Sequence, residues 1–177
     1  MARGTLRVGQ RVRITVDPAR RETRKHHTAT HLLHAALRRV VGDHVAQAGS
    51  LVTPERLRFD VSHGAPITPE QLHEVETLVN GWVQADLPVG ARVVPIDEAR
   101  ASGAMMLFGE KYGSEVRMIT IGEPTASPSI ELCGGTHVGR TGEIGPVLVT
   151  AEEAASAGVR RIEALAGRAA LAHGQQL

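Results

Sequence analysis

The sequence predicts an α+β domain with a largely antiparallel sheet, two main helices and a short N-terminal β-hairpin that forms a partial barrel. Short segments in which apolar and polar residues alternate recur along the chain, as expected of half-buried strands. Two longer segments repeat apolar residues at intervals of three or four positions, which is typical of helices that pack on a core. Turns containing Gly and Pro separate these segments.

The first part of the chain is predicted to contain a helix between two hairpins. Residues 5–16 alternate apolar and basic side chains around a central Gly-Gln, the pattern of two short strands joined by a turn. Residues 21–41 repeat apolar positions at helical spacing and end at a glycine, which commonly stops a helix. Residues 48–52 and 57–62 form the second predicted hairpin, and apolar side chains alternate with polar ones in its second arm.

A second helix is predicted to begin after residue 68. Thr68 can cap it, Pro69 fits the first turn, where no backbone donor is needed, and Gln71 completes a capping box. Apolar residues then recur at helical spacing and are expected to face the core: Leu72, Val75, Val79, Trp82 and Val83. Further strands are predicted at residues 92–96, 115–121, 145–150 and 158–164.

Composition restricts the class of protein. The 177 residues, 42% hydrophobic and 22% charged, suit one globular domain with a substantial core. No apolar run approaches the roughly 20 residues of a membrane span, and the basic N-terminus lacks the apolar stretch of a signal peptide. A single Cys excludes an internal disulfide, so we expect a reducing, cytoplasmic location.

Charge is distributed unevenly along the chain. Residues 1–41 carry ten Lys/Arg and two Asp/Glu, whereas residues 42–177 carry ten and seventeen, so a segment of +8 precedes a body of −7. A basic segment of this kind indicates an anionic partner such as nucleic acid. An arginine-rich surface without a partner would give the same charge, so both interpretations stay open at this point.

A candidate metal site is split between two distant parts of the sequence. His27 and His31 are four residues apart on the first predicted helix, so their imidazoles project from one face. The only Cys, Cys133, precedes His137 by four positions, and the glycines between them let a short loop turn both side chains toward one point. Each half alone is better explained as ordinary structure. Together, one thiolate and three imidazoles form a suitable set of ligands for Zn²⁺.

The remaining histidines are sorted by their spacing from this pair. His34 shares the face of His27 and His31, and it is the best candidate for a substitute ligand or an outer hydrogen-bonding group. His26 points about 100° away and is expected to be solvated beside Lys25. Four others lack a partner at ligand spacing and are expected at surface or capping positions: His44, His63, His73 and His173.

Taken together, these motifs resemble the editing domain of alanyl-tRNA synthetases. The matching stretches follow the family's order from about residue 6 to residue 170, although His26 stands where the family pattern usually has Asn. They are residues 27–34 (HTATHLLH), 47–52 (QAGSLV), 58–60 (RFD), 107–113 (LFGEKYG), 133–137 (CGGTH) and 157–164 (AGVRRIEA). The editing domain of threonyl-tRNA synthetase is similar in fold and metal motifs, but the Gly-Gly-Thr between Cys133 and His137 favours the alanyl type.

The resemblance implies a deacylase that hydrolyses the ester joining serine or glycine to the acceptor end of tRNA-Ala. It implies a Zn²⁺ ion held by His27, His31, Cys133 and His137. Because four protein ligands complete a tetrahedron, it stays open whether the ion acts in catalysis or only shapes the pocket.

The resemblance also places Thr30 and Gln47 near the substrate. Thr30 lies on the metal-facing side of the helix, where its hydroxyl is suited to donate to a seryl side chain or to orient water. The alternative is a hydrogen bond back to the preceding helical turn. Gln47 corresponds to a family position associated with editing, and the alternative for it is a surface residue at a strand edge.

The basic residues that directly precede the histidine pair are expected to hold phosphates near the acceptor end: Arg20, Arg21, Arg24 and Lys25. The chain has only two Phe, one Tyr and one Trp, so base stacking should contribute little, and RNA binding should depend steeply on salt.

We divide the chain into a basic N-terminal β segment (1–20), a zinc-dependent editing domain (21–170) and a C-terminal tail (171–177). Nothing in it resembles an ATP-binding aminoacylation domain. We therefore expect either a free-standing editor with a reduced N-terminal barrel or an editing domain separated from a synthetase, and the match to the bacterial synthetase pattern favours the second.

Two functions of other classes are kept as alternatives. A zinc-stabilised module that binds tRNA without catalysis would use the same residues. A metallohydrolase for small metabolites is less well supported, because the histidine pair lacks the Glu of an HExxH motif and the basic segment would be unexplained.

Overall fold

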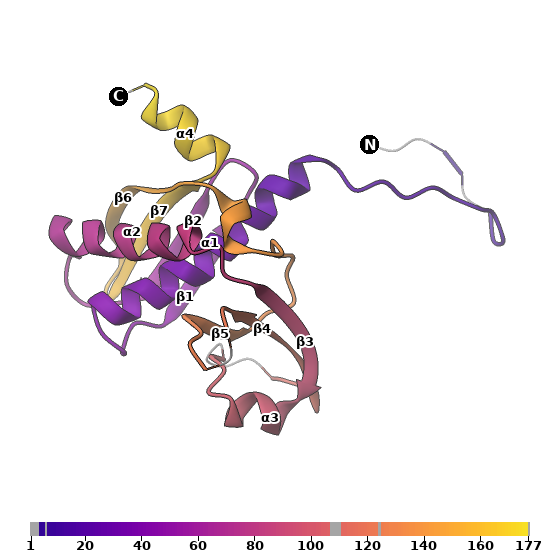
Figure 1. Cartoon of the computed structure of the whole chain (residues 1–177), viewed down its shortest axis with the longest axis horizontal. Helices are drawn as coiled ribbons and strands as arrows, with labels where there is room; N and C mark the ends of the chain where they lie inside the picture. Colours follow the sequence, from indigo (N-terminus) through magenta and orange to yellow (C-terminus); the bar gives the residue numbers. More distant parts are fainter. Residues whose placement is uncertain (1–3, 6, 107–110, 124, 177) are drawn as a thin grey trace.

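The computed structural model describes residues 4–5, 7–106, 111–123 and 125–176, which form two antiparallel sheets with four α-helices (Figure 1). The larger sheet has the order β1-β2-β7-β6 and contains β1 (Gln47–Val52), β2 (Leu57–Ser62), β7 (Val159–Ala166) and β6 (Val147–Ser156). The smaller sheet has the order β3-β4-β5 and contains β3 (Val89–Pro95), β4 (Glu115–Ile121) and β5 (Ser129–Leu132). The predicted α+β class and the antiparallel pairing are therefore confirmed.

Two long helices cover one face of the larger sheet (Figure 1). They are α1 (Ala19–Val40) and α2 (Pro69–Gln84), and they also pack against each other. The shorter helices are α3 (Ile96–Ala101), α4 (Arg168–Gly174) and the 3-10 turn η1 (Thr141–Ile144). None of these short elements, nor β5, is predicted by the sequence patterns, and α4 occupies part of the predicted C-terminal tail.

The main core lies between the helices and the larger sheet. The buried face of α1 contributes Leu32, Leu33 and Leu37, which belong to the same apolar cluster as Phe59 of β2 and Ile162 of β7. The capping box of α2 is confirmed, since the Thr68 hydroxyl accepts from the backbone N–H of Gln71 and the Gln71 side chain accepts from that of Thr68. The predicted apolar stripe of α2 also faces the core: Val75, Val79 and Val83 are buried, and Leu72 and Trp82 pack against it.

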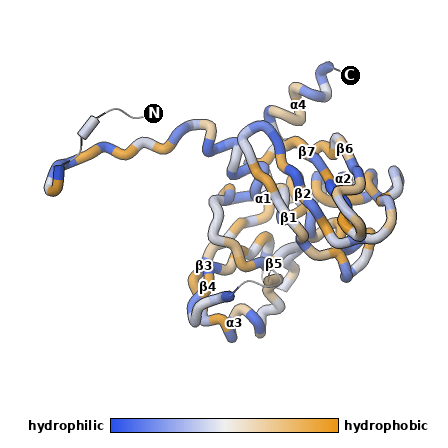
Figure 2. Tube along the Cα trace, turned by 180° about the vertical axis from the view of Figure 1, so that it is seen from behind, coloured by the Kyte–Doolittle hydropathy of each residue, from blue (hydrophilic) through white to orange (hydrophobic). Residues whose placement is uncertain are grey.

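The predicted N-terminal hairpin is wrong for the residues that the structure describes. Residues 4–5 and 7–17 contain a turn but no strand, and they extend away from the body (Figure 1). Apolar and basic residues alternate along this arm (Figure 2), but Val8, Ile14 and Val16 are exposed because no sheet pairs with it. An isolated two-stranded hairpin is marginally stable in water. No sheet in the described part of the chain closes into a barrel, so the partial barrel is also wrong.

His26 is buried rather than solvated, which corrects the sequence prediction. The ring is 0% exposed; its Nδ1–H donates to the carbonyl of Glu22 (3.1 Å), and its Nε2 accepts from the N–H of Ala166 in β7 (3.0 Å). The prediction failed because α1 is covered on more than one side, by β7 as well as by α2. Burial lowers the pKa of His26 and keeps the ring neutral.

None of the helices in the described ranges is long and apolar enough to cross a membrane.

The neutral state of His26 predicts a pH-dependent contribution to stability. In the unfolded chain the ring has its ordinary pKa of 6.5, whereas burial lowers the pKa in the folded chain. Below pH 6.5 the unfolded state therefore binds a proton that the folded state does not, and stability falls by up to about 1.4 kcal/mol per pH unit until the folded pKa is reached. The gap in unfolding free energy between wild type and His26→Gln should narrow between pH 7 and pH 5, measured by urea denaturation.

An exposed histidine on α2 provides the control. His73 is exposed, and His73→Gln keeps the buried His26, so the stability of this variant should fall between pH 7 and pH 5 as that of the wild type does. A difference in unfolding free energy between wild type and His26→Gln that stays constant from pH 7 to pH 5 would contradict the assignment of a neutral, buried ring.

Candidate metal centre and adjoining pockets

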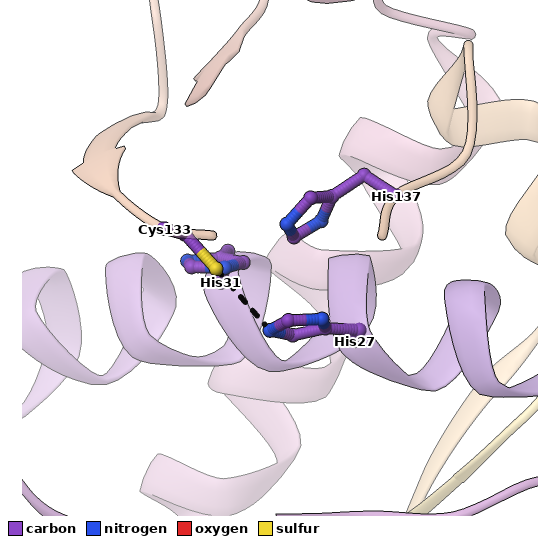
Figure 3. Close-up of side chains that lie close together, drawn as sticks. All are labelled: His27, His31, Cys133 and His137. Atoms are coloured by element: carbon purple, nitrogen blue, oxygen red, sulfur yellow. Dashed lines mark hydrogen bonds between the residues drawn. The ribbon is translucent and has the colours of Figure 1, made fainter. Parts of the chain in front are cut away.

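The four predicted metal ligands meet at one point. His27 and His31 project from α1, and Cys133 and His137 lie on the loop that follows β5 (Figure 3). One ligand atom from each residue lies within 4.8 Å of those of the others, and the Sγ of Cys133 is 3.5 Å from the Nε2 of His27. We call these four residues the metal cluster. Helix α1 and this loop, a hundred residues apart in sequence, thus bring together three imidazoles and one thiol.

Arg117 and Gly135 set the course of the loop. The guanidinium of Arg117, on β4, donates to the carbonyls of Cys133 (2.8 Å) and Gly135 (2.6 Å). The N–H of Gly135 donates to the Sγ of Cys133 (3.4 Å). A Cβ at Gly135 would lie 2.0 Å from the His27 ring, so only glycine lets the loop approach α1 this closely.

Thr28 orients the ring of His137. Its hydroxyl donates to the carbonyl of Arg24 (3.1 Å) and accepts from the N–H of Val138 (3.2 Å). The same oxygen lies 3.2 Å from the Nδ1 of His137. Because the hydroxyl proton is already used, Nδ1 must carry the hydrogen, which leaves a lone pair on Nε2.

Glu131 orients the ring of His31 in the same way. Its carboxylate is buried on β5 and lies 2.6 Å from the Nδ1 of His31. It also accepts from the hydroxyl of Ser129 (2.9 Å), and the Nδ1 of His34 is 3.5 Å away. His34 therefore lies outside the metal cluster and next to Glu131, and its ring makes a T-shaped contact with the ring of Phe59.

The donor atoms fit a metal ion. The Nε2 atoms of His31 and His137 are buried and have no hydrogen-bond partner among the described residues, while their Nδ1 atoms contact Glu131 and Thr28. An imidazole whose far nitrogen is held by an outer hydrogen bond is the usual arrangement of a metal-binding histidine. The set of three imidazoles and one thiol suits a borderline-soft cation such as Zn²⁺.

Charges inside the cluster favour the thiolate. Burial alone would raise the pKa of Cys133, but the neighbouring imidazoles of His137, His27 and His31 stabilise the thiolate, outweigh burial and hold the pKa at about 3. Burial alone would lower the pKa of His31, yet the Glu131 carboxylate raises it to about 10. The sulfur is therefore in its metal-binding form at neutral pH, whereas a metal ion has to displace a proton from His31.

A cavity of about 510 Å³, which we call the cluster pocket, adjoins the metal cluster. His27, His31 and Cys133 line it together with Thr30 and Gln47, so the two predicted substrate-contacting residues lie in the same pocket as three of the predicted ligands. The Thr30 hydroxyl donates to the carbonyl of His26 (2.8 Å), which is the alternative predicted from the sequence, a hydrogen bond back to the preceding helical turn. Its oxygen is thus available to the pocket as an acceptor. Gln47 is half-buried at the start of β1.

The predicted phosphate-binding residues lie at the start of α1, on another side of the metal cluster. Arg20, Arg21 and Arg24 line a second cavity of about 960 Å³, which His137 also lines. Arg24 donates to the carbonyl of His137 (2.5 Å), and Lys25 pairs with Glu22 (3.0 Å). Two of the four residues are thus engaged within the chain, while Arg20 and Arg21 are exposed.

Sequence reasoning missed the three residues that orient the cluster. Glu131 carried a usable signal, because it precedes Cys133 by two positions at the end of a strand, and alternate strand residues share a face. Thr28 and Arg117 carried none, since their partners are more than a dozen residues away. Among the other histidines, His44 and His63 form an unexpected hydrogen-bonded pair (2.9 Å) at the surface. Residues 107–110, part of one family motif, lie outside the described residues.

Comparison with known proteins gives the class and then the particular family. Residues 116–163, which include Cys133 and His137 of the metal cluster, match the threonyl and alanyl tRNA synthetase second additional domain. The chain is 62% identical over 170 residues to the alanine–tRNA ligase of Thermus thermophilus and 55% identical over 177 residues to that of Methylobacillus flagellatus. These matches cover 95% and 99% of this chain. The chain corresponds to the editing region of alanyl-tRNA synthetases, as the motifs predicted.

The match is to a segment of longer proteins. The chain spans about a fifth of the length of these relatives, 19% of the Thermus thermophilus protein and 20% of the Methylobacillus flagellatus protein. The alanine–tRNA ligase of Mesorhizobium japonicum, 54% identical over 180 residues, gives the same proportion, with 98% of this chain and 20% of that protein covered.

The close approach of Gly135 to His27 predicts a sharp difference between neighbouring glycines. Gly135→Ala should displace the His27 ring or the loop, and it should weaken metal binding at least tenfold. Gly134→Ala is the matched control, because a Cβ at Gly134 meets nothing within 4 Å. Competition with a chromogenic chelator measures both affinities. Equal metal affinities for the two variants would contradict the geometry of the loop.

Proposed function

We propose that this chain hydrolyses the ester that joins serine or glycine to the acceptor end of tRNA-Ala. The observation that carries the proposal is the cluster pocket, where Thr30 and Gln47 face the same cavity as His27, His31 and Cys133. Homology to the editing region of alanyl-tRNA synthetases supports tRNA-Ala as the nucleic acid. An aminoacyl ester is already reactive, so the site needs only to orient water and to stabilise the developing oxyanion.

His27, His31, Cys133 and His137 would hold the metal ion, and the donor set favours Zn²⁺. When bound, the ion would supply Lewis-acid polarisation of the ester carbonyl. Glu131 and Thr28 act through the ligands, because they hold the His31 and His137 rings in the orientation that frees Nε2.

Thr30 and Gln47 are the proposed substrate-contacting residues. Because the Thr30 hydroxyl donates to the carbonyl of His26, we assign its oxygen the role of accepting a hydrogen bond from the seryl hydroxyl. Alanine would leave that buried oxygen without a partner, which disfavours its binding. Glycine cannot be selected in this way, so the pocket wall must exclude the alanine methyl group. The Gln47 side-chain amide is suited to donate to the ester carbonyl oxygen or to hold water.

A tRNA-binding module without catalytic activity is the second candidate. The observation that favours it is the number of protein ligands, because four ligands are typical of a closed, structural zinc site. The metallohydrolase for small metabolites has no comparable support, since the similar proteins are alanine–tRNA ligases. The same relatives favour the alanyl over the threonyl type.

The test is deacylation of Ser-, Gly- and Ala-tRNA-Ala by the zinc-loaded chain. We expect release of serine and glycine well above the spontaneous rate and slow release of alanine. Cys133→Ala removes the thiolate ligand and should lower both the zinc content and the deacylation rate, by at least tenfold for the rate. Zinc content is measured by atomic emission and deacylation by loss of labelled amino acid from the RNA.

Two variants of Thr30 separate chemistry from folding. Thr30→Ser keeps the oxygen and should retain discrimination between serine and alanine, whereas Thr30→Val removes it and should reduce that discrimination. Spontaneous rates for all three substrates at every zinc loading would refute the deacylase and leave the binding module. Full zinc occupancy in Cys133→Ala would refute the ligand assignment.

A further inference from the structure

Five arginines from three separate elements converge on one cavity beside the metal cluster. Its volume is about 960 Å³, and we call it the arginine cavity. The arginines come from the first turns of α1, from β4 and from the start of α4: Arg20, Arg21, Arg24, Arg117 and Arg168. Arg117 and Arg168 belong to no part of the basic segment, so the fold gathers more positive charge here than the sequence indicates.

The five arginines divide into two groups by their contacts. Arg24 and Arg117 donate to backbone carbonyls of the loop that carries Cys133 and His137. Arg20, Arg21 and Arg168 are exposed, and their side chains have no hydrogen-bond or ion-pair partner within the described ranges. Arg24 and Arg117 are therefore fixed by the loop of the metal cluster. The exposed guanidinium groups of the other three arginines are available to bind a ligand.

The carboxylates of the cavity do not cancel this charge. Asp17 and Glu22 line the cavity, but Asp17 accepts from the N–H of Ala19 (2.8 Å) and Glu22 pairs with Lys25 (3.0 Å), which is not a lining residue. Five guanidinium groups thus face two carboxylates that already have partners. An excess of positive charge in a concave site attracts polyanions.

The lining chemistry selects phosphate rather than bases. Guanidinium groups bind phosphate oxygens in a bidentate manner, and among the described residues no Phe, Tyr or Trp lines the cavity to stack a base. His137 lines the arginine cavity, while the other three ligands line the cluster pocket, so the metal cluster lies between the two. A strand whose end enters the cluster pocket would place its preceding phosphates at the arginine cavity.

We propose that Arg20, Arg21 and Arg168 bind the phosphodiester backbone of an RNA strand whose terminal ester lies in the cluster pocket. The position of that ester rests on the proposed function, whereas the phosphate site stands on the arginines themselves. Arg24 and Arg117 are positioning residues that couple this site to the loop of Cys133 and His137. Lys25, paired with Glu22, contributes little direct phosphate contact.

The experiment measures binding of uncharged tRNA-Ala to the zinc-loaded 177-residue chain by fluorescence anisotropy over a series of salt concentrations. The slope of log affinity against log salt is negative, and each lost phosphate contact should reduce its absolute value by about 1, so Arg21→Gln/Arg168→Gln should reduce it by about 2. At physiological salt the Kd should rise roughly tenfold or more. Arg20→Gln alone should reduce the absolute value of the slope by about 1.

Arg100→Gln is the matched control. It removes one positive charge, as Arg20→Gln does, from an exposed arginine on α3, an element distant from the arginine cavity (Figure 1), and it should leave the Kd and the slope unchanged. Thermal unfolding and zinc content, equal in all variants, verify that each one folds. A Kd and slope for Arg21→Gln/Arg168→Gln equal to those of Arg100→Gln would overturn the proposal.

A second arm titrates inorganic phosphate into the wild-type chain and the same variants. The proposal is supported if phosphate competes with tRNA-Ala for the wild-type chain and this competition disappears in Arg21→Gln/Arg168→Gln. It is overturned, in favour of a site for a free anion, if the variants lose phosphate binding while their Kd for tRNA-Ala stays unchanged. Because the RNA is uncharged, neither arm depends on ester hydrolysis, and a failure of the proposed function would be seen separately in the deacylation assay.

Discussion

The close approach of the loop after β5 to helix α1 is the constraint on which the rest of the structure depends. It requires a glycine at position 135, where a Cβ would overlap the His27 ring, and it requires Arg117 to hold the carbonyls of the loop. Thr28 and Glu131 then set the ring orientations of His137 and His31. Each of these contacts joins segments that are distant in sequence. The metal cluster is therefore a product of the tertiary fold rather than of a local motif.

The metal cluster divides the surrounding surface into two chemically different sites. The cluster pocket is lined by Thr30, Gln47 and three of the ligands, and it includes the apolar side chains of Met105 and Met106. The arginine cavity on the side of His137 carries the positive charge. Such a division suits a substrate with a small reactive end and a polyanionic body. The loop that carries Cys133 and His137 lines both the cluster pocket and the arginine cavity. A substitution that moves this loop in one site should therefore alter binding in the other.

Most of the regular structure could be predicted because it rests on local patterns. The capping box at Thr68 and the alternation in β2 both predict their elements correctly. The prediction of an N-terminal hairpin is wrong because alternation predicts a strand only where another strand can pair with it, and Val8 and Ile14 are exposed here. The prediction that His26 is solvated is wrong because helical periodicity cannot show that α1 is covered on several sides. The four residues of the metal cluster could be predicted as candidate ligands from composition and spacing, whereas the roles of Thr28 and Arg117 depend on contacts with distant residues.

The central claim is that one thiolate and three imidazoles of this chain surround a single metal ion. X-ray absorption spectroscopy at the zinc edge of the zinc-loaded chain tests it most directly, because sulfur and imidazole nitrogen scatter distinguishably. The account predicts one sulfur and three imidazole nitrogens in the first coordination shell, with the sulfur lost in Cys133→Ala. A first shell of nitrogen and oxygen alone, or one unchanged in Cys133→Ala, would contradict it.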